Sequence, residues 1–361
     1  CIATGGGSST FSSADPLDHA ATEAASGCTH KPSAPDQSIV GRVALPEAPL
    51  ELGCPLTDGY LASRLTALVF TSPVPSHPSL EMISAVIQSF RFLPGLADCR
   101  LIVTCDGPGR VSDEVRPKRG LLTADLHQRY EDSITRLRTT LGDGRLLVLP
   151  ERQGFGLAVR AAIELVTTPY VLICQHDNLF CRPVDLHNVV RVMEANTDEL
   201  KCVHFVSPKT TFEEKGAGGD PGLRRVEDRL GRVAGGLVRF GAVPGLTMDF
   251  WPMPSWLERN HVCLTSHYRD FVLGPSTRIK PGQFIEETFG QGMRRDLAAG
   301  GSHKKYGVFR LLDTPESATL HLDGRSYLPK EELQQRGWNG KVSKVYTRLE
   351  QEHRAWLASG C

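Results

Sequence analysis

Four consecutive polar residues interrupt an otherwise apolar stretch, 165–183 (LVTTPYVLICQHDNLFCRP), and could do chemistry together. They follow directly on the apolar run Tyr170 to Cys174 and are Gln175, His176, Asp177 and Asn178. The run predicts a buried strand, and ligands of open α/β sheets bind outside the carboxyl ends of the strands. A carboxylate there suits a hard divalent cation, Mg²⁺ or Mn²⁺, bridged to a diphosphate. We predict that Asp177 is this anchor; the alternative is a helix cap or turn former.

Three more residues are expected near the same sheet edge. Asp106 ends the predicted strand Leu101–Cys105, where its carboxylate could accept a hydrogen bond from a nucleobase or a ribose hydroxyl, or simply begin an Asp-Gly turn. Gly154 lies between a strand and a helix, which lets the backbone approach a ligand ahead of a helix N-terminus. Arg160, one turn into that helix, could reach a phosphate or lie on a solvated helix face.

A second group of candidates lies late in the chain. Glu286 and Glu287 are adjacent on a predicted helix, so at most one faces a site, where it could act as general base. His321 is a possible metal ligand or an ordinary polar residue. An aromatic and polar segment predicts an acceptor site with stacking surfaces, or alternatively plain core; its residues are Trp251, Trp256, Asn260 and His261.

The elements that must position these residues alternate along the chain. Apolar runs predict strands at 65–70, 101–105, 146–149, 170–174 and 203–206. Helical periodicity predicts helices at 80–90, 123–141, 157–166 and 185–195. The alternation predicts an α/β fold with a mostly parallel sheet covered by helices on both faces. After residue 206 we expect a loop at 208–234, short strands at 236–240, 306–312 and 318–321, and helices at 283–297 and 341–357.

Composition narrows the class of protein. The 361 residues carry 41 basic and 41 acidic side chains, so the net charge favours neither nucleic-acid nor membrane-surface binding. No apolar run approaches the length of a membrane span. The ten cysteines lack zinc-type pairing, and disulfides are possible but not implied. Residues 1–60 are rich in Gly, Ser, Ala, Pro and Thr and predict a linker or disordered arm.

In order and spacing, residues 65–325 resemble the family 2-like glycosyltransferases of the GT-A fold. Leu-Val-Phe-Thr-Ser-Pro (68–73) resembles the first nucleotide-binding strand and loop, which implies donor contacts from Thr71, Ser72 and Pro73. Asp106 resembles the base-binding acid, and the 154–163 segment is similar to the Gly-rich helix start of that family. Gln-His-Asp-Asn (175–178) takes the place of the DXD motif, with Gln175 instead of the first acid.

The resemblance extends to the late candidates. Phe-Ile-Glu-Glu-Thr-Phe-Gly-Gln (284–291) resembles the Glu-Asp acceptor-side helix, whose second acid is the base, and this points to Glu287. His321 falls where many such enzymes place a histidine that completes metal coordination. The implied fold is GT-A-type and Rossmann-like, with a smaller antiparallel acceptor-side portion. The implied division is an arm (1–60), a nucleotide-sugar half (61–206), an acceptor half (207–330) and a helical extension (331–361).

The resemblance implies an enzyme that moves a sugar from a nucleotide-sugar to the hydroxyl of a glycan or other acceptor, inverting and dependent on Mn²⁺ or Mg²⁺. Three other interpretations stay open. A sugar-nucleotidyltransferase would normally carry a Gly-rich basic loop after the first strand, which 71–76 lacks. A catalytically inactive, carbohydrate-binding relative is consistent with Gln175. An unrelated α/β function is the plainest alternative. We expect a cytoplasmic protein if the chain is complete, and a Golgi-lumen protein if an N-terminal anchor precedes it.

Overall fold

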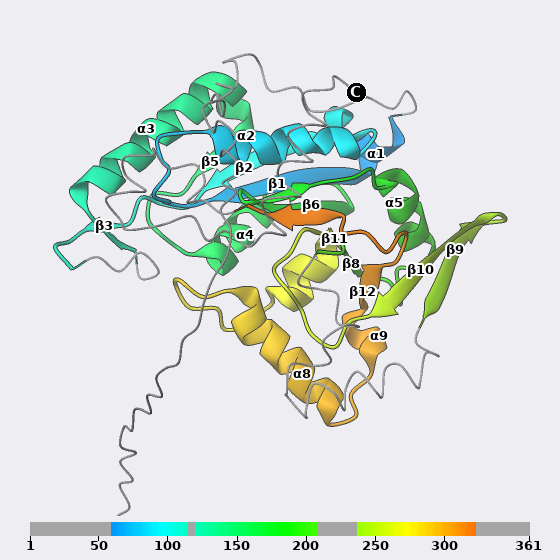
Figure 1. The fold of residues 1–361 in the computed structure, drawn as a ribbon. Helices are drawn as coiled ribbons and strands as arrows, with labels where there is room; N and C mark the ends of the chain where they lie inside the picture. Colours follow the sequence, from blue (N-terminus) through cyan, green and yellow to red (C-terminus); the bar gives the residue numbers. More distant parts are fainter. Residues whose placement is uncertain (1–58, 115–119, 208–236, 323–361) are drawn as a thin grey trace, which may run out of the picture. The chain divides into compact units, whose positions relative to one another are not determined.

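The structure, a computed structural model, describes residues 59–114, 120–207 and 237–322 (Figure 1). These residues belong to one compact unit of the chain. Four predictions fall wholly or almost wholly outside them: the arm at 1–60, the loop at 208–234, the helix at 341–357 and the extension at 331–361. Within the described ranges, no helix is long and apolar enough to cross a membrane.

A nine-stranded sheet forms the centre of the described region, in the order β5-β2-β1-β6-β11-β8-β12-β10-β9. β5, β2, β1 and β6 are parallel, as are β8 and β12. β11 runs antiparallel to both of its neighbours, and so does β10. The strands are β1 (Leu65–Thr71), β2 (Arg100–Cys105), β5 (Leu146–Val148), β6 (Tyr170–Gln175), β8 (Cys202–His204), β9 (Val238–Val243), β10 (Leu246–Pro252), β11 (His261–Leu264) and β12 (Val308–Leu311).

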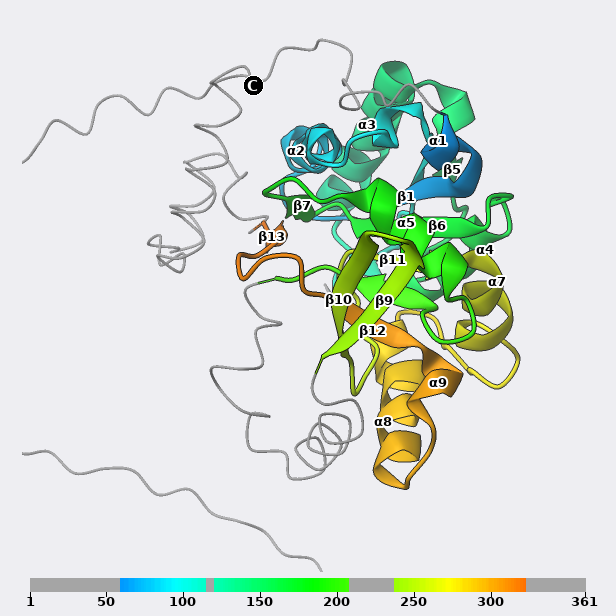
Figure 2. The ribbon, with the colours of Figure 1, turned by 90° about the vertical axis from the view of Figure 1, so that its right-hand side faces the viewer.

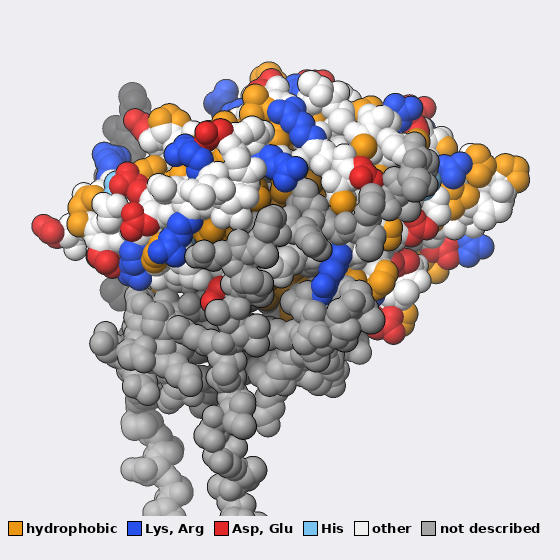
Figure 3. All heavy atoms as spheres, turned by 90° about the horizontal axis from the view of Figure 1, so that it is seen from above, with side chains coloured by type: hydrophobic (Ala, Val, Ile, Leu, Met, Phe, Trp, Pro, Cys, Tyr) orange, Lys and Arg blue, Asp and Glu red, His pale blue; other side chains and the backbone are white. Residues whose placement is uncertain are grey.

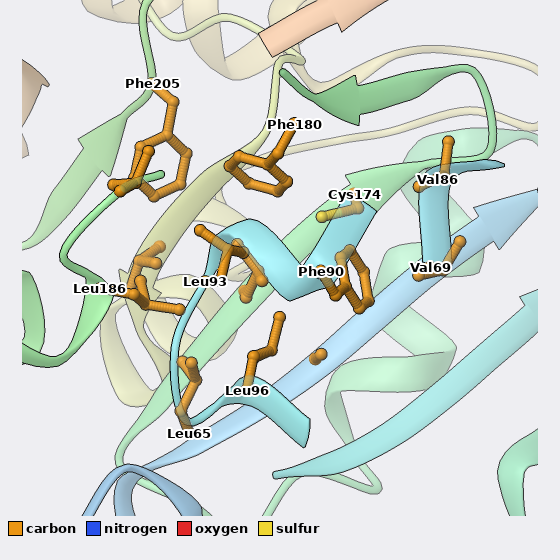
Figure 4. Close-up of a cluster of buried hydrophobic side chains, with 14 of the residues drawn as sticks. Leu65, Val69, Val86, Phe90, Leu93, Leu96, Cys174, Phe180, Leu186 and Phe205 are labelled. Carbon is orange, nitrogen blue, oxygen red and sulfur yellow. The ribbon is translucent and has the colours of Figure 1, made fainter. Parts of the chain in front are cut away.

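The helices cover both faces of this sheet, which confirms the predicted α/β class. On one face, α2 (Glu81–Gln88), α3 (Ala124–Leu141) and α5 (Leu186–Ala195) share a buried apolar cluster with alternate residues of β1 (Figure 1). Figure 4 shows part of this cluster, with Val86 of α2 and Leu186 of α5 near Leu65 and Val69 of β1. On the other face, α4 (Phe155–Ile163) packs against the intervening residues of β1. All seven residues of β1 are therefore buried, as expected of a parallel strand inside a two-layered cover.

Local sequence signals explain where the helices begin. The Thr123 hydroxyl accepts a hydrogen bond from the backbone N–H of Leu126 at 3.1 Å, an N-cap for α3. Asp185 caps α5 in the same way through Asn188 N–H at 3.1 Å. Ahead of α2, the Ser79 hydroxyl accepts from the backbone N–H of Glu81 at 3.2 Å. Each cap satisfies an N–H group that has no partner inside its helix.

The antiparallel portion differs in detail from the prediction. β9 and β10 form a hairpin that extends the main sheet at one edge (Figure 2). In the strand order, β11 is inserted between β6 and β8. β7 (Asn178–Phe180) follows β6 almost directly and pairs antiparallel with β13 (Thr319–His321). The predicted helix at 283–297 begins as a π-helical turn, η6 (Glu286–Gly290), and continues as α8 (Gln291–Ala298).

The remaining elements are short. They are α1 (Tyr60–Arg64), α7 (Thr265–His267), α9 (His303–Tyr306), the π-helical turn η5 (Tyr268–Val272), the 3-10 turns η1 (Ser89–Phe92), η2 (Leu96–Asp98) and η4 (Asp143–Arg145), and the strand pair β3 (Arg110–Val111) and β4 (Leu121–Leu122). Viewed over α2 and α3, basic and acidic side chains are interspersed on the described surface (Figure 3). This mixture agrees with the neutral net charge.

Candidate functional site

Asp177 and His321 meet at the carboxyl edge of β6. Asp177 lies in the turn between β6 and β7, and the pairing of β7 with β13 sets His321 opposite Asn178. The backbone N–H of Leu322 donates to the Asp177 carbonyl at 2.6 Å, which completes this register. As a result, His321 Nε2 lies 3.2 Å from Asp177 Oδ2, with 38% and 23% of the two side chains exposed. Both groups are therefore open to a ligand.

The Asp177 carboxylate is held in its ionised form. Burial tends to raise its pKa, but the hydrogen bond with His321 and the nearby His176 and His321 charges outweigh burial, and the net pKa is lowered. The second oxygen, Oδ1, accepts from Asn178 Nδ2 at 3.0 Å. An oriented, ionised carboxylate is the state that a divalent cation requires.

The loop after β1 lies beside this pair. The backbone N–H of His176 donates to the Phe70 carbonyl at 2.9 Å, and the buried His176 side chain has no partner for Nδ1 among the described residues. Burial, and then the charges of His176 and Arg129, lower the pKa of neighbouring His77 to about 3. Of the predicted donor contacts in this loop, Ser72 is half-buried, whereas the side chains of Thr71 and Pro73 are buried.

Asp106 is placed at the same edge but is only 3% exposed. Its carboxylate accepts from the backbone N–H groups of Gly107 at 3.1 Å, Gln153 at 2.7 Å and Gly154 at 3.0 Å. Arg152 Nη1 lies 3.5 Å from Oδ2. The carboxylate thus ties down the loop that precedes α4, and a contact with a nucleobase stays a prediction.

Gly154 joins this loop to the segment that leads to the two glutamates. Its φ is +81°, and a Cβ there would lie 2.5 Å from the Cα of Gly282. The backbone N–H of Gly282 donates to the Gln153 carbonyl at 2.8 Å, and that of Gly156 donates to the Gln283 carbonyl at 3.2 Å. The glycine is required by close backbone approach.

Glu258 is a site residue that the sequence reasoning missed. The side chain is 7% exposed, and Oε1 accepts from the backbone N–H groups of Ile285 and Glu286, the start of η6. Oε2 has no partner among the described residues. Burial, together with the nearby Glu286 and Glu287 charges, raises its pKa to about 9 despite the two N–H donors, so the group is neutral at pH 7.

Glu258 also connects to the strand end that carries Asp177. Gln175 Nε2 donates to the Glu258 carbonyl oxygen at 2.9 Å. In the sequence, Glu258 is a single acid in a segment without helical or strand periodicity. No local signal separates it from a surface glutamate, because its burial comes from η6 folding across it.

Glu286 and Glu287 are both exposed in the first turn of η6. Glu286 Oε2 lies 3.4 Å from the backbone N–H of Glu258, whereas Glu287 Oε2 accepts from the backbone N–H of Phe284 at 3.2 Å. The two carboxylates therefore have different partners. Which of them acts as a base stays a prediction.

Four predicted site residues lie elsewhere. Arg160 Nη2 donates to the carbonyl oxygens of Leu273 at 3.1 Å and Thr277 at 3.3 Å, in a separate cavity. Trp251 is half-buried on β10. Asn260 and His261 are fully buried: Asn260 Nδ2 donates to the Asn178 carbonyl at 2.8 Å, and the His261 ring packs against those of His204, Trp256 and Tyr268. These two side chains support β7 and β11 from inside and are not presented to a ligand.

The chemistry of the donor set fits a divalent cation that is shared with a substrate. Across the described ranges, no group of three or more His, Cys, Asp and Glu side chains comes together as a metal site. Asp177 and His321 offer one carboxylate oxygen and one imidazole nitrogen, and both are accessible. Mg²⁺ is commonly held by one or two carboxylates plus substrate phosphates, so two protein ligands suffice.

The chain matches no protein-family model and no curated protein. Among solved structures, it is similar to TarS residues 1–349 of S. aureus, with 11% identity, 80% of this chain and 69% of that chain covered, and a TM-score of 0.37. A mannosyltransferase of Pyrobaculum calidifontis, solved with GDP-Man and Mn²⁺, gives 13% identity, coverage of 86% and 76%, and a TM-score of 0.37. Glucosyl-3-phosphoglycerate synthase of Mycobacterium tuberculosis gives 12% identity, coverage of 76% and 76%, and a TM-score of 0.33. At these values the likeness carries no assignment of chemistry.

Proposed function

We propose that this protein is a nucleotide-sugar-dependent glycosyltransferase that acts on an acceptor hydroxyl with inversion at the anomeric carbon. The observation that carries the proposal is the pairing of Asp177 with His321 at the carboxyl edge of β6, 3.2 Å apart and accessible. Two side chains far apart in sequence, each able to bind a divalent cation, meet at the edge where α/β sheets bind ligands.

The donor is proposed to lie along the ends of β1, β2 and β6. Ser72 is half-buried in the loop after β1, and the Gly154 loop supplies backbone close to the N-terminus of α4. Asp106 contributes by holding that loop through three backbone N–H groups. These contacts orient the nucleoside diphosphate without contributing to bond breaking.

Asp177 and His321 would hold Mn²⁺ or Mg²⁺ on the diphosphate. A bound cation offsets the negative charge that develops on the leaving phosphate. The lowered pKa of Asp177 supports this role, because the carboxylate needs no deprotonation before the cation binds.

Glu287 is proposed as the general base. It removes the proton from the acceptor hydroxyl as the hydroxyl oxygen bonds to the anomeric carbon, while the bond to the diphosphate oxygen breaks on the opposite face. The transition state is oxocarbenium-like, by analogy with glycoside hydrolysis. Glu258 positions the turn that carries Glu287, since its Oε1 accepts the first N–H groups of η6. The acceptor is a glycan or another hydroxyl-bearing molecule.

The test is sugar transfer and donor hydrolysis with UDP- and GDP-sugars, with and without Mn²⁺. We expect Asp177→Asn to lower turnover at least ~1,000-fold through lost transition-state stabilisation, and Glu287→Gln to lower it ~100-fold or more. Glu286→Gln and Asp143→Asn, an exposed carboxylate beyond the end of α3, are matched controls expected to stay within about threefold. Full activity of both Asp177→Asn and Glu287→Gln would exclude the proposal.

A catalytically inactive, carbohydrate-binding protein is the second candidate. It is favoured by Gln175, which replaces an acid and whose Nε2 is already engaged with the Glu258 carbonyl at 2.9 Å. In that case a free glycan raises the thermal midpoint in proportion to its affinity, whereas no nucleotide sugar is consumed.

A further inference from the structure

A cavity of about 650 Å³ lies between α4 and the segment 269–279. Three of its lining residues are arginines, Arg160, Arg269 and Arg278, and one is an acid, Asp270. Neither Asp177 nor His321 lines it, so it is separate from the proposed donor site. Arg269 Nε also lies 3.8 Å from Glu164 Oε1, so three guanidinium groups outnumber two nearby carboxylates, and this excess favours an anionic ligand.

Two of the arginines are held in place by backbone carbonyls. Arg160 Nη2 donates to Leu273 and Thr277, and its Nε and Nη1 have no partner among the described residues. Arg269 Nη2 donates to the carbonyl oxygens of Ile163 and Val166, each at 3.1 Å. Their positions are therefore fixed before any ligand arrives, which lowers the entropic cost of binding.

Arg278 is different, because its side chain is exposed and makes no hydrogen bond or ion pair with any described residue. It also lines a neighbouring cavity of about 340 Å³ on the other side of the same segment. An exposed guanidinium that lines the same cavity as a fixed one can close on a tetrahedral oxyanion with paired N–H donors.

We propose that this cavity binds a phosphate-bearing small anion between Arg160 and Arg278. The proposal does not depend on glycosyl transfer, since none of the proposed transfer residues lines the cavity. Arg160 and Arg269 could serve only to hold α4 in place through their hydrogen bonds to backbone carbonyl oxygens. That role does not account for Arg278.

An anion bound in the cavity would affect the donor side through the chain segment that connects the two. The chain continues from Thr277 and Arg278 to Ile279, whose side chain lies beside Gly156, and to Gly282, which packs on Gly154. An anion that steadies residues 273–279 thus steadies the backbone hydrogen bonds from Gly282 to Gln153 and from Gly156 to Gln283. Slower amide exchange at these positions is the expected sign of that link.

The experiment titrates the full chain with inorganic phosphate against chloride at constant ionic strength, by calorimetry and by hydrogen exchange. We expect saturable binding that Arg278→Ala weakens at least about tenfold. Lys280→Ala removes an equal charge from the same segment, exposed and outside both cavities, and should stay within about twofold. Asp177→Asn should bind phosphate as the wild type does.

Three results would overturn the proposal. Equal weakening by Arg278→Ala and Lys280→Ala would mean general charge attraction. Unchanged binding by Arg278→Ala would exclude the cavity. Binding altered by Asp177→Asn would place the phosphate at the donor site. None of these outcomes bears on transfer activity, so the two proposals fail separately. Unchanged exchange at Gly156 and Gly282 on saturation would overturn the link to the donor side.

Discussion

Asp106 follows β2 and Asp177 follows β6, so both lie at the carboxyl edge of the same sheet. Their surroundings nevertheless differ. Asp106 is 3% exposed, and three backbone N–H groups and an arginine surround its carboxylate. Asp177 keeps 23% of its side chain exposed and faces His321, whose side chain is 38% exposed. Position at the carboxyl edge of a sheet therefore does not by itself make a ligand-binding acid.

The difference comes from what the chain places next to each carboxylate. The backbone after β5 folds back over Asp106 and supplies N–H donors from Gln153 and Gly154. Opposite Asp177, the β7–β13 pair supplies a side chain, His321, and leaves space around it. The first carboxylate shapes a loop, whereas the second remains available to a cation.

The largest expected effect on stability comes from adding a side chain at Gly154, where the loop held by Asp106 packs closely against Gly282. Gly154→Ala should lower the free energy of unfolding by about 4 kcal/mol, because it combines a backbone conformation open mainly to glycine with a clash against Gly282. Gly142→Ala is the matched control: its φ is +79° and its ψ 153°, but no atom lies within 4 Å of the added Cβ. It should cost about 2 kcal/mol. Urea unfolding measures both.

Equal losses of unfolding free energy in the two glycine variants would show that Gly282 can move away from the added methyl group without cost. In that case the Asp106 loop would not be tightly clamped to the segment before η6. The contrast between the closed and the open carboxylate would then rest on the hydrogen bonds alone.

The next effect separates the two carboxylates directly. Asp106→Ala should lower the free energy of unfolding by about 3 kcal/mol, since three backbone N–H groups lose a buried charged acceptor. Asp177→Ala should cost less than about 1 kcal/mol, because its ion pair with His321 is partly solvated. Chemical unfolding compares the variants, and similar losses would mean that Asp177 is structural as well.

Much of the fold follows from sequence periodicity. The runs 65–70 and 101–105 and the central strand are buried strands of the parallel sheet, because an uninterrupted apolar run suits a strand covered on both faces. The sequence does not predict β11 (His261–Leu264), since its first residue, His261, and the preceding Asn260 are polar residues that are nonetheless buried. Tertiary packing overrides composition at that point.

The candidate site is harder to predict from the sequence than the sheet is. His321 is raised as a possible metal ligand by its residue type and then by the family resemblance, and the β7–β13 pairing brings it to 3.2 Å from Asp177. Arg160 has the residue type and spacing of a phosphate ligand, but its helix face turns it toward the carbonyls of Leu273 and Thr277. Glu258 gave no signal, because its neutral state depends on burial by a turn that lies later in the chain. The periodicity of a sequence does not show which side chains far apart in the chain will contact each other.

A pH-dependent effect extends the comparison to a third carboxyl group, Glu258, which is buried with one oxygen unpaired among the described residues. Its folded-state pKa is raised from 4.5 to about 9, so the folded protein keeps a proton that the unfolded chain has lost. The contribution of Glu258 to the stability of the wild type therefore falls as pH rises from 4.5 toward 9. Glu258→Gln mimics the protonated form and keeps an acceptor for Ile285 and Glu286. Its stability relative to the wild type should rise by up to about 1.4 kcal/mol per pH unit in this window.

Urea unfolding of both proteins between pH 5 and 8 tests the Glu258 prediction, with Glu258→Ala as the control for the two lost N–H bonds. The alanine variant should be less stable than the glutamine variant throughout, because it leaves the first N–H groups of η6 without their acceptor. A glutamine variant whose relative stability does not change with pH would mean that Glu258 is ionised when folded. Burial would then not be what sets the charge of this carboxyl group, and the neutral positioning role proposed for it would fail.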